Sequence, residues 1–475
     1  MTEARDAAIA GALGRMHSGA FRDLLAALVA IPSTSQEAEH APDVARYLEG
    51  AIGPWLKRLG FTVAIHANPI PGMGPILLAQ RIESPDLPTV LTYGHGDTVR
   101  GLDEQWDEGL SPWRLTEAGE RWYGRGTADN KGQHALNLTA LEAILAARGG
   151  TLGFNIKILL ETCEEQGSQG LREFVAAHAG ELAADVLLAS DGPRVASNIP
   201  TIATGSRGVF DFELALSLRA GGVHSGNWGG ITTDPAIVLA HAIATLADRH
   251  GRILVPGFLP PQGLPEGVRA ALAGCELANE GDAARIDPDW GEPGLTPAEK
   301  LYGWTSFIVL ALHAGRPENP VNAVPPKARA WCQLRYTVDA DPARFVPALR
   351  AHLDAGGFAG VAIENAGIGM AASRTDPIHP WVRFAAASME KTLGRRVQVV
   401  PNAAGGLPGD VFIDHLGVPL VWIPHSYNGC KQHGPNEHLL AGPAREGLAA
   451  FAGLWWDLGE LSRRGLRHGQ MPAAA

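Results

Sequence analysis

The fold is decided by the stretch PTVLTYGHGDTV at residues 88–99, an apolar strand that runs directly into a histidine flanked by glycines and then an aspartate. Alternate residues of an extended segment point to the same side, so His95 and Asp97 should project together. A metal-binding histidine usually donates its second ring N–H to a carboxylate, which fixes its tautomer and raises its basicity. We therefore hypothesise that His95 binds a metal ion and that Asp97 orients it, with a turn that carries a surface histidine as the alternative.

Strand-like and helix-like segments alternate on both sides of this stretch. The predicted strands lie at residues 61–65, 76–82, 89–93, 154–160, 185–189, 397–400 and 418–423. The predicted helices lie at residues 20–30, 41–59 with a kink near Gly53, 132–148, 171–178, 380–393 and 444–461. This alternation is the signature of a mainly parallel sheet with helices on both of its faces.

Residues 201–368 follow a different pattern. Apolar and polar residues alternate at 210–218 and 328–338, which predicts half-exposed strands of an antiparallel sheet. Asp234-Pro235 and Asp341-Pro342 each open a predicted helix, with aspartate as the N-cap and proline at the first helical position. We therefore predict an α/β catalytic domain built from residues 1–200 and 369–475, interrupted by an inserted α+β domain at 201–368. The proline-rich stretch 255–303 shows no clear periodicity, and the tail 469–475 is expected to be disordered.

Composition limits the classes of function. The chain has 475 residues, a formal net charge of -11, 45% hydrophobic residues and 19% charged residues, which is ordinary for a soluble enzyme. The acidic balance argues against nucleic-acid binding, which needs a basic surface. Four scattered cysteines form no CxxC pair, and no stretch resembles a signal peptide or a membrane span, so we expect a cytoplasmic protein with no membrane partner.

Four further clusters of acidic or imidazole side chains fall at strand ends. They are Asp129 in GRGTADNKG (124–132), Glu164 and Glu165 in ETCEEQGS (161–168), Asp191 in SDG (190–192), and His433 and His438 in HGPNEH (433–438). Each of the first three clusters also has a purely structural explanation. Asp129 could be a helix N-cap, the two glutamates could lie in a solvated loop, and Asp191 could belong to a simple turn.

Taken together, these clusters predict a metal centre. Open α/β sheets build their sites at the carboxyl ends of their strands. Two histidines and three carboxylates suit a pair of divalent ions bridged by one carboxylate, and these donors favour zinc, with manganese or cobalt as alternatives. Two close ions can activate a water and stabilise an oxyanion, while a spare carboxylate must take the proton from that water. The Glu164-Glu165 pair offers one ligand and one general base.

The segments YGHGDTV, GRGTADNKG, ETCEEQGS, SDG and HGPNEH resemble the dinuclear zinc family of aminoacylase, acetylornithine deacetylase, carboxypeptidase G and carnosinase-type dipeptidases. The five segments occur in the family's order and cover nearly the whole chain. The resemblance implies a catalytic domain with an inserted lid and dimerisation domain, and hence a homodimer formed through the lid.

The resemblance also implies a role for each residue of the centre. His95 and Asp191 would bind one zinc ion, and Glu165 and His433 would bind the other. Asp129 would bridge both ions, and in this family the bridging residue is commonly followed by a cis peptide bond, here to Asn130. The family pattern favours His433 over His438 as the ligand. Asp97 would orient His95, and Glu164 would be the general base and proton shuttle.

Residues outside the five segments are also implicated by the resemblance. The stretch GVHSGNWGG (222–230) resembles a segment of the dipeptidase branch whose histidine, here His224, reaches the partner's site and holds the oxyanion; a turn is the alternative. Arg335 aligns with a lid arginine that binds the substrate carboxylate, with a strand-surface arginine as the alternative. Gly405 and Gly406 resemble a loop that lines the substrate pocket, although a plain loop fits as well, and Asn322 is a further candidate contact.

The sequence therefore predicts a hydrolase of the dipeptidase or carboxypeptidase type. It would cleave an amide or peptide bond next to a free carboxylate of a small peptide, by attack of a metal-bound hydroxide with Glu164 as the base. One alternative is a deacylase of N-acyl amino acids, of the acetylornithine or succinyl-diaminopimelate type. Another is a catalytically silent metal-binding homologue. The HSGNWGG segment and the large lid favour the peptidase.

Overall fold

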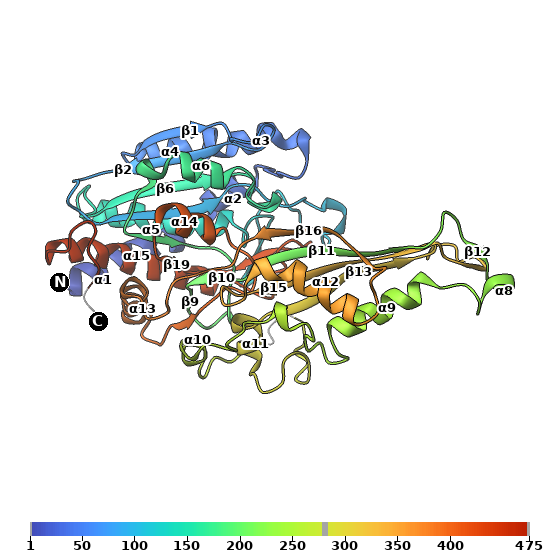
Figure 1. The fold of residues 1–475 in the computed structure, drawn as a ribbon. Coiled ribbons are helices and arrows are strands. Elements are labelled where there is room, and N and C mark those ends of the chain that lie inside the picture. Colours follow the sequence, from blue (N-terminus) through green and yellow to red (C-terminus); the bar gives the residue numbers. More distant parts are fainter. Residues whose placement is uncertain (1, 278–283, 473–475) are drawn as a thin grey trace.

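The structure is a computed structural model that describes residues 2–277 and 284–472. Two sheets organise the chain, one with eight strands and one with four. Figure 1 shows that the larger sheet and its helices form the body of the molecule, while the strands of the smaller sheet extend into a long arm. No helix in the described part of the chain combines the length and the apolar character needed to cross a lipid bilayer.

The eight-stranded sheet has the order β1-β2-β6-β3-β7-β19-β9-β18. Its strands are β1 (Thr62–His66), β2 (Ile76–Arg81), β3 (Thr89–His95), β6 (Asn155–Glu161), β7 (Val186–Ala189), β9 (Thr201–Ala203), β18 (Gln398–Val400) and β19 (Leu420–Trp422). The central strands β6, β3, β7 and β19 are parallel, whereas β1 and β2 are antiparallel to their neighbours. The prediction of a mixed, mainly parallel sheet is confirmed.

Helices cover both faces of this sheet because successive strand residues point to opposite sides. Val90, Ile156 and Leu188 belong to one apolar core, and their neighbours Leu91 and Leu187 belong to the other. The first core includes α1 (Thr2–His17), α2 (Ala20–Val29), α5 (Lys131–Ala147), α13 (Pro380–Leu393) and α15 (Ala441–Arg463). The second core includes α6 (Leu171–Ala177) and α14 (Gly409–Leu416). Burial on both faces explains why the strand sequences are almost continuously apolar.

The helix predicted at 41–59 is present, and its helical type changes at Gly53, where a break or kink was expected. A π-helical turn, η2 (Tyr47–Ile52), separates α3 (Ala41–Arg46) from α4 (Gly53–Arg58). Pro54 lies near the junction of η2 and α4 and has no N–H to donate to the preceding turn, which interrupts the helical hydrogen bonding there.

The four-stranded antiparallel sheet has the order β13-β15-β11-β16. Its strands are β11 (Gly208–Ser217), β13 (Ser306–Ala314), β15 (Lys327–Tyr336) and β16 (Ala362–Met370). Two helices, α9 (Pro235–Leu246) and α12 (Phe345–Ala355), share an apolar core with one face of this sheet. Asp234 caps α9 as predicted, because its Oδ1 accepts the Ala236 N–H at 2.8 Å.

Some elements of the inserted segment were not predicted. The edge strand β13 is mostly exposed and carries consecutive apolar residues, so no alternating pattern marks it. The edge strand β16 contains Ala, Asn and Gly, which have low strand propensity. The proline-rich stretch holds the short helices α10 (Glu266–Ala271) and α11 (Pro297–Gly303).

The C-terminal tail was predicted to be disordered from residue 469. In the structure the Gly469 N–H donates to Asp185 Oδ1 at 2.6 Å, and residues 473–475 lie outside the described residues.

The chain crosses between the two sheets twice, at adjacent points. β10 (Gly205–Ser206) follows β9 and pairs with β17 (Ser373–Arg374), which precedes α13. The Thr375 N–H also donates to the Thr204 carbonyl oxygen at 2.7 Å. The arm is therefore carried by one continuous segment whose two ends lie side by side.

Candidate metal centre

His95 is the last residue of β3, at the carboxyl edge of the large sheet, and the residues on either side of it have no space for a side chain. A Cβ atom on Gly94 would lie 2.9 Å from His134 Cβ, and one on Gly96 would lie 2.4 Å from a Tyr47 ring carbon. The two glycines therefore let β3 pass between α5 and the Tyr47 ring. As a result, His95 is fully buried at the strand end.

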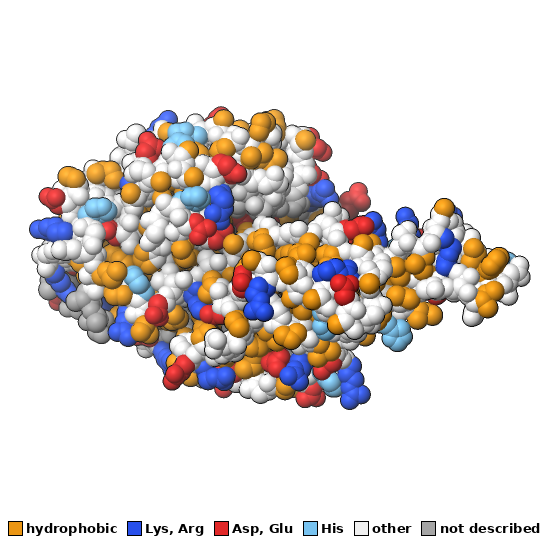
Figure 2. All heavy atoms as spheres, viewed as in Figure 1, with side chains coloured by type: hydrophobic (Ala, Val, Ile, Leu, Met, Phe, Trp, Pro, Cys, Tyr) orange, Lys and Arg blue, Asp and Glu red, His pale blue; other side chains and the backbone are white. Residues whose placement is uncertain are grey.

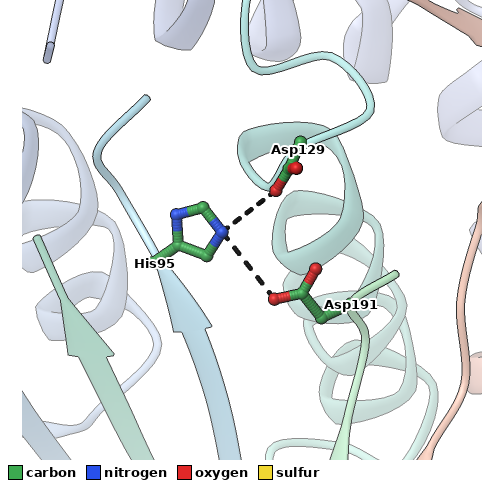
Figure 3. A group of neighbouring side chains, drawn as sticks. All are labelled: His95, Asp129 and Asp191. Atoms are coloured by element: carbon green, nitrogen blue, oxygen red, sulfur yellow. Dashed lines mark hydrogen bonds and ion pairs between the residues drawn. The ribbon is translucent and has the colours of Figure 1, made fainter. Parts of the chain in front are cut away.

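Three of the predicted residues converge at this edge (Figure 3). His95 Nε2 lies 3.1 Å from Asp129 Oδ1 and 3.7 Å from Asp191 Oδ2, and both carboxylates point toward the imidazole ring. Asp129 precedes α5 and Asp191 follows β7, so each comes from a different element. One ligand atom from each of the three side chains lies within 4.8 Å of the others, which makes them a candidate site for a metal ion.

A second group shares Asp129 with the first. His433 Nε2 lies 3.2 Å from Asp129 Oδ2 and 3.1 Å from Glu165 Oε2. The two oxygens of Asp129 thus face different histidines, which is the arrangement that a bridging carboxylate requires. The peptide bond from Asp129 to Asn130 is cis, which confirms that expectation.

Asp97 contacts His95, which it was predicted to orient, and also the backbone of Glu164 and Glu165. Its Oδ1 lies 3.3 Å from His95 Nδ1, and its two carboxylate oxygens accept the backbone N–H groups of Glu164 and Glu165 at 3.2 and 3.1 Å. A single carboxylate therefore fixes both the His95 ring and the turn that carries the two glutamates. The adjacent-glutamate motif alone gave no sign of this link.

Glu164 lies beside the two groups without belonging to either of them. Its Oε2 is 4.0 Å from His95 Nε2. Burial raises the pKa of Glu164 well above its usual value. A carboxylate with a raised pKa at the edge of a metal centre can accept a proton and give it up again, as a general base must.

The electrostatics of the cluster fit a pair of divalent cations. Burial, together with the nearby charge of Asp129, raises the pKa of Glu165 to about 7 and that of Asp191 to about 6. Hydrogen bonds to Asp129 and Glu165 raise the pKa of His433 to about 11. Several buried carboxylates thus crowd around two imidazoles, and two divalent ions would balance their negative charge. Imidazole and carboxylate are also the donors that such ions prefer.

His438 is not a member of either group among the described residues. Its Nε2 lies 2.9 Å from the Tyr427 hydroxyl oxygen, and the side chain is fully buried. His433 is therefore the histidine of HGPNEH that stands with the carboxylates.

The structure places His224 and Asn322 together, at the tip of the arm. β12 (Val223–His224) pairs with β14 (Ala323–Val324), and the Ser225 N–H donates to the Asn322 carbonyl oxygen at 3.0 Å. Figure 1 shows β12 and α8 (Ser225–Trp228) at the far end of the arm from the large sheet. Within the described residues of one chain, no hydrogen bond or ion pair joins His224 or Asn322 to the metal-binding groups.

Arg335 lies on the face of the small sheet opposite its helices, because its neighbours Leu334 and Tyr336 point into the core shared with α9 and α12. Its Nε donates to Gln333 Oε1 at 2.9 Å, and no carboxylate in the described part of the chain forms an ion pair with it. An arginine in this state is free to bind a carboxylate from a substrate.

The glycine-rich loop packs against the crossing between the sheets. The Leu407 N–H donates to Ser206 Oγ at 3.1 Å, and a Cβ on Gly406 would lie 2.7 Å from Met370 Sδ, whereas one on Gly405 would meet nothing within 4 Å. A buried arginine that the sequence did not single out, Arg207, donates through Nε to the Ala404 carbonyl oxygen at 3.0 Å.

Sequence reasoning also missed a buried ion pair behind Asp129. Arg125 Nη1 donates to Glu437 Oε2 at 2.8 Å, and both side chains are fully buried. Both residues stand inside motifs that were singled out, GRGTADNKG and HGPNEH. Nothing in either motif predicts that they meet, because 312 residues separate them.

Comparison with known proteins agrees with this geometry. A model of "Peptidase family M20/M25/M40" matches residues 91–457. The chain is similar to a cysteinylglycine-S-conjugate dipeptidase of Corynebacterium striatum, with 30% identity over 74% of this chain and 76% of that one. It is 27% identical to a Beta-Ala-His dipeptidase of Mus musculus, over 86% of this chain and 83% of that one. Its fold matches the crystal structure of human carnosine dipeptidase 1 with a TM-score of 0.78, at 22% identity over 96% of this chain and 99% of that one.

Proposed function

This chain belongs to peptidase family M20/M25/M40, and from that membership we propose that it is a metal-dependent dipeptidase acting next to a free carboxylate. The observation that carries the proposal is the pair of candidate metal groups that share Asp129 at the carboxyl edge of the sheet. The similar proteins from Corynebacterium striatum and Mus musculus are dipeptidases, which favours a small peptide as the substrate.

We propose that two zinc ions occupy the centre. His95 and Asp191 would hold one ion, Glu165 and His433 would hold the other, and Asp129 would bridge them, as the distances between their ligand atoms support. When bound, the ions would make a water acidic and stabilise negative charge on the substrate carbonyl oxygen.

The chain's own residues would handle the proton and the substrate. Glu164 Oε2, beside His95, would take a proton from the attacking water and deliver it to the leaving amine. Asp97 would keep the His95 ring and the Glu164 backbone in place during the reaction. Arg335, which has no carboxylate partner among the described residues, would bind the free carboxylate of the peptide. The backbone of Gly405 and Gly406 would line the pocket beside it.

We also propose that the protein is a homodimer formed through the inserted lid domain. Figure 2 shows hydrophobic side chains gathered along the arm, and exposed apolar residues there include Ile231, Ile237 and Leu312. Such a surface is typical of a protein–protein interface. The partner's His224 would then reach the metal centre and stabilise the oxyanion, with Asn322 next to it.

We propose a cytoplasmic location on the basis of the state of the cysteines. All four are free, and three of them are buried. Unpaired thiols are typical of a reducing compartment.

The test combines metal analysis with a substrate panel. Protein purified without added metal should contain about two zinc ions per chain, and chelation should abolish hydrolysis until zinc is restored. The purified enzyme should cleave dipeptides faster than N-acetyl or N-succinyl amino acids. Preference for the acylated substrates would replace the dipeptidase with a deacylase, and failure to bind zinc, manganese or cobalt would overturn the proposal.

A further inference from the structure

The Glu437 carboxylate is surrounded by donors from one short loop. Glu437 Oε1 accepts the backbone N–H groups of Ala128 and Asp129 at 2.9 and 3.0 Å. The Gly126 N–H lies 3.1 Å from both carboxylate oxygens, and Arg125 Nη1 donates to Oε2 at 2.8 Å. Three backbone N–H groups and one guanidinium thus converge on a carboxylate that is fully buried.

This loop is the one that ends in the shared carboxylate of the metal centre. The N–H group of Asp129 itself donates to Glu437, so the backbone that carries the Asp129 side chain is fixed at its own nitrogen. The Gly124 N–H adds a hydrogen bond to the Glu437 carbonyl oxygen at 3.0 Å, which extends the contact along the loop.

Glu437 also belongs to the segment that supplies His433. Two hydrogen bonds fix this segment. The His438 N–H donates to the Cys430 carbonyl oxygen at 3.0 Å, and Asn436 Oδ1 accepts the Asp107 N–H at 2.9 Å. One short segment therefore provides a candidate ligand directly and holds a second candidate ligand through its backbone.

We propose that Glu437 is a positioning residue that sets the distance between Asp129 and His433, so that its carboxylate preorganises both metal sites at once. The inference rests on the proposed function, because it assigns Glu437 to the same centre. Mutation of a residue that holds a metal ligand in place typically lowers metal affinity or activity by about 10- to 100-fold. Glu437 is hydrogen-bonded to the backbone N–H of Asp129 and to donors of residues 125–128, and it is not a member of either group of candidate ligands in the described part of the chain.

Replacement of the carboxylate by an amide isolates this role. In Glu437→Gln one oxygen remains as an acceptor, but the side-chain NH₂ group must face either Arg125 Nη1 or the N–H groups of Ala128 and Asp129. The buried donors that it faces then lose their acceptor. The volume of the side chain is nearly unchanged, so the Asp129 loop should relax without a new cavity. Asp129 would then stand less firmly between the two histidines.

A matched control exists far from the centre. Glu299 is also buried, accepts a hydrogen bond from Arg269 Nη1 at 2.8 Å, and accepts the Thr296 N–H at 2.8 Å. Glu299→Gln therefore removes a buried, arginine-paired carboxylate that also binds backbone. It should perturb local stability in a comparable way without acting on the metal ligands.

The experiment measures zinc retained by the purified holoprotein at a series of buffered free-zinc concentrations, by elemental analysis after desalting. We expect the wild type and Glu299→Gln to release zinc at the same concentration. Glu437→Gln should need about 10- to 100-fold more free zinc to stay loaded. Unfolding midpoints in excess chelator should be similar for the two variants, and added zinc should restore the activity of Glu437→Gln.

A folded Glu437→Gln that releases zinc at the same concentration as the wild type would overturn the inference. If that variant does not fold, Arg125→Lys decides, because it keeps the charge and the Glu437 carboxylate but loses the guanidinium hydrogen bond at Oε2. A smaller shift in the same direction is expected there, and no shift would again overturn the inference. A wild type that binds no metal would instead overturn the proposed function, so the two failures are distinct.

Discussion

Each oxygen of the Asp129 carboxylate faces a different imidazole ring, His95 on one side and His433 on the other. Hydrogen bonds with both rings outweigh the effect of burial on Asp129 and hold its pKa below its usual range. Asp129 is therefore the carboxylate of the cluster that stays ionised, which suits a bridge between two cations. The neighbouring Asp191 and Glu165, with their raised pKa values, depend more on an added positive charge.

The role of Glu164 can be tested at the level of this one residue. Glu164→Gln should keep its two metal ions but lower kcat by about 10²- to 10⁴-fold, because the amide cannot accept the proton from water. Metal content by elemental analysis and steady-state kinetics on a dipeptide give the two readouts. Glu173→Gln, on the exposed side of α6, is the control and should behave as the wild type. Full turnover in a metal-loaded Glu164→Gln would remove Glu164 from the reaction.

At the scale of elements, the end of β3 is held from several directions. The Gly96 N–H donates to the Glu161 carbonyl oxygen at 2.9 Å, which continues the pairing of β3 with β6. Ser33 Oγ donates to the Gly96 carbonyl oxygen at 2.6 Å, and the Tyr47 ring closes the remaining side. These contacts enclose the end of β3 and fix the position of His95.

Gly96→Ala should therefore destabilise the protein. The added Cβ would lie 2.4 Å from a Tyr47 ring carbon, so β3 or η2 must shift. We expect the free energy of unfolding, measured in urea, to fall by about 1–3 kcal/mol, as overpacking of a core usually costs. Gly367→Ala on β16, where a Cβ would meet nothing within 4 Å, should change it little. Equal stability of the two variants would contradict this prediction, because it would mean that the Tyr47 ring can move aside at no cost in free energy.

The elements differ in how much of them the sequence reveals. The buried strands and the candidate ligands at their ends were predictable, because continuous apolar runs followed by His95, Glu165 or Asp191 combine two independent patterns. The edge strands β13 and β16 were not, because their pairing depends on neighbours rather than on a buried face of their own. The contacts of Asp97 with the glutamate backbone and of Glu437 with the Asp129 loop also escaped prediction, since such contacts join distant segments without any spacing rule.

At the scale of the whole molecule, the arm carries His224 away from the metal centre of its own chain (Figure 1). A second chain could place its arm tip over the first chain's site. In a twofold dimer both subunits make the same contacts, so each arm tip would lie over the partner's site. The proposed oxyanion contact would then exist only in the dimer.

Mixing two inactive variants tests this arrangement. Glu164→Gln lacks the proposed base, and His224→Ala lacks the proposed oxyanion donor. When the two are unfolded, mixed in equal amounts and refolded together, random pairing makes half of the dimers mixed. One site of each mixed dimer is then complete, so activity should recover to about a quarter of the wild-type value. Each variant refolded alone is the control, and no recovery in a mixture shown to contain mixed dimers would place His224 outside the partner's site.

The order of strands in the large sheet has a consequence for the growing chain. β19 lies between β7 and β9, although both of these strands are made long before it. The place between β7 and β9 therefore cannot be filled until residues 420–422 have been synthesised, and His433 and Glu437 follow later still. Pairings between strands that are distant in sequence are slow to form, because they must close a long loop. The candidate metal centre therefore cannot be complete while the ribosome is still making the middle of the chain.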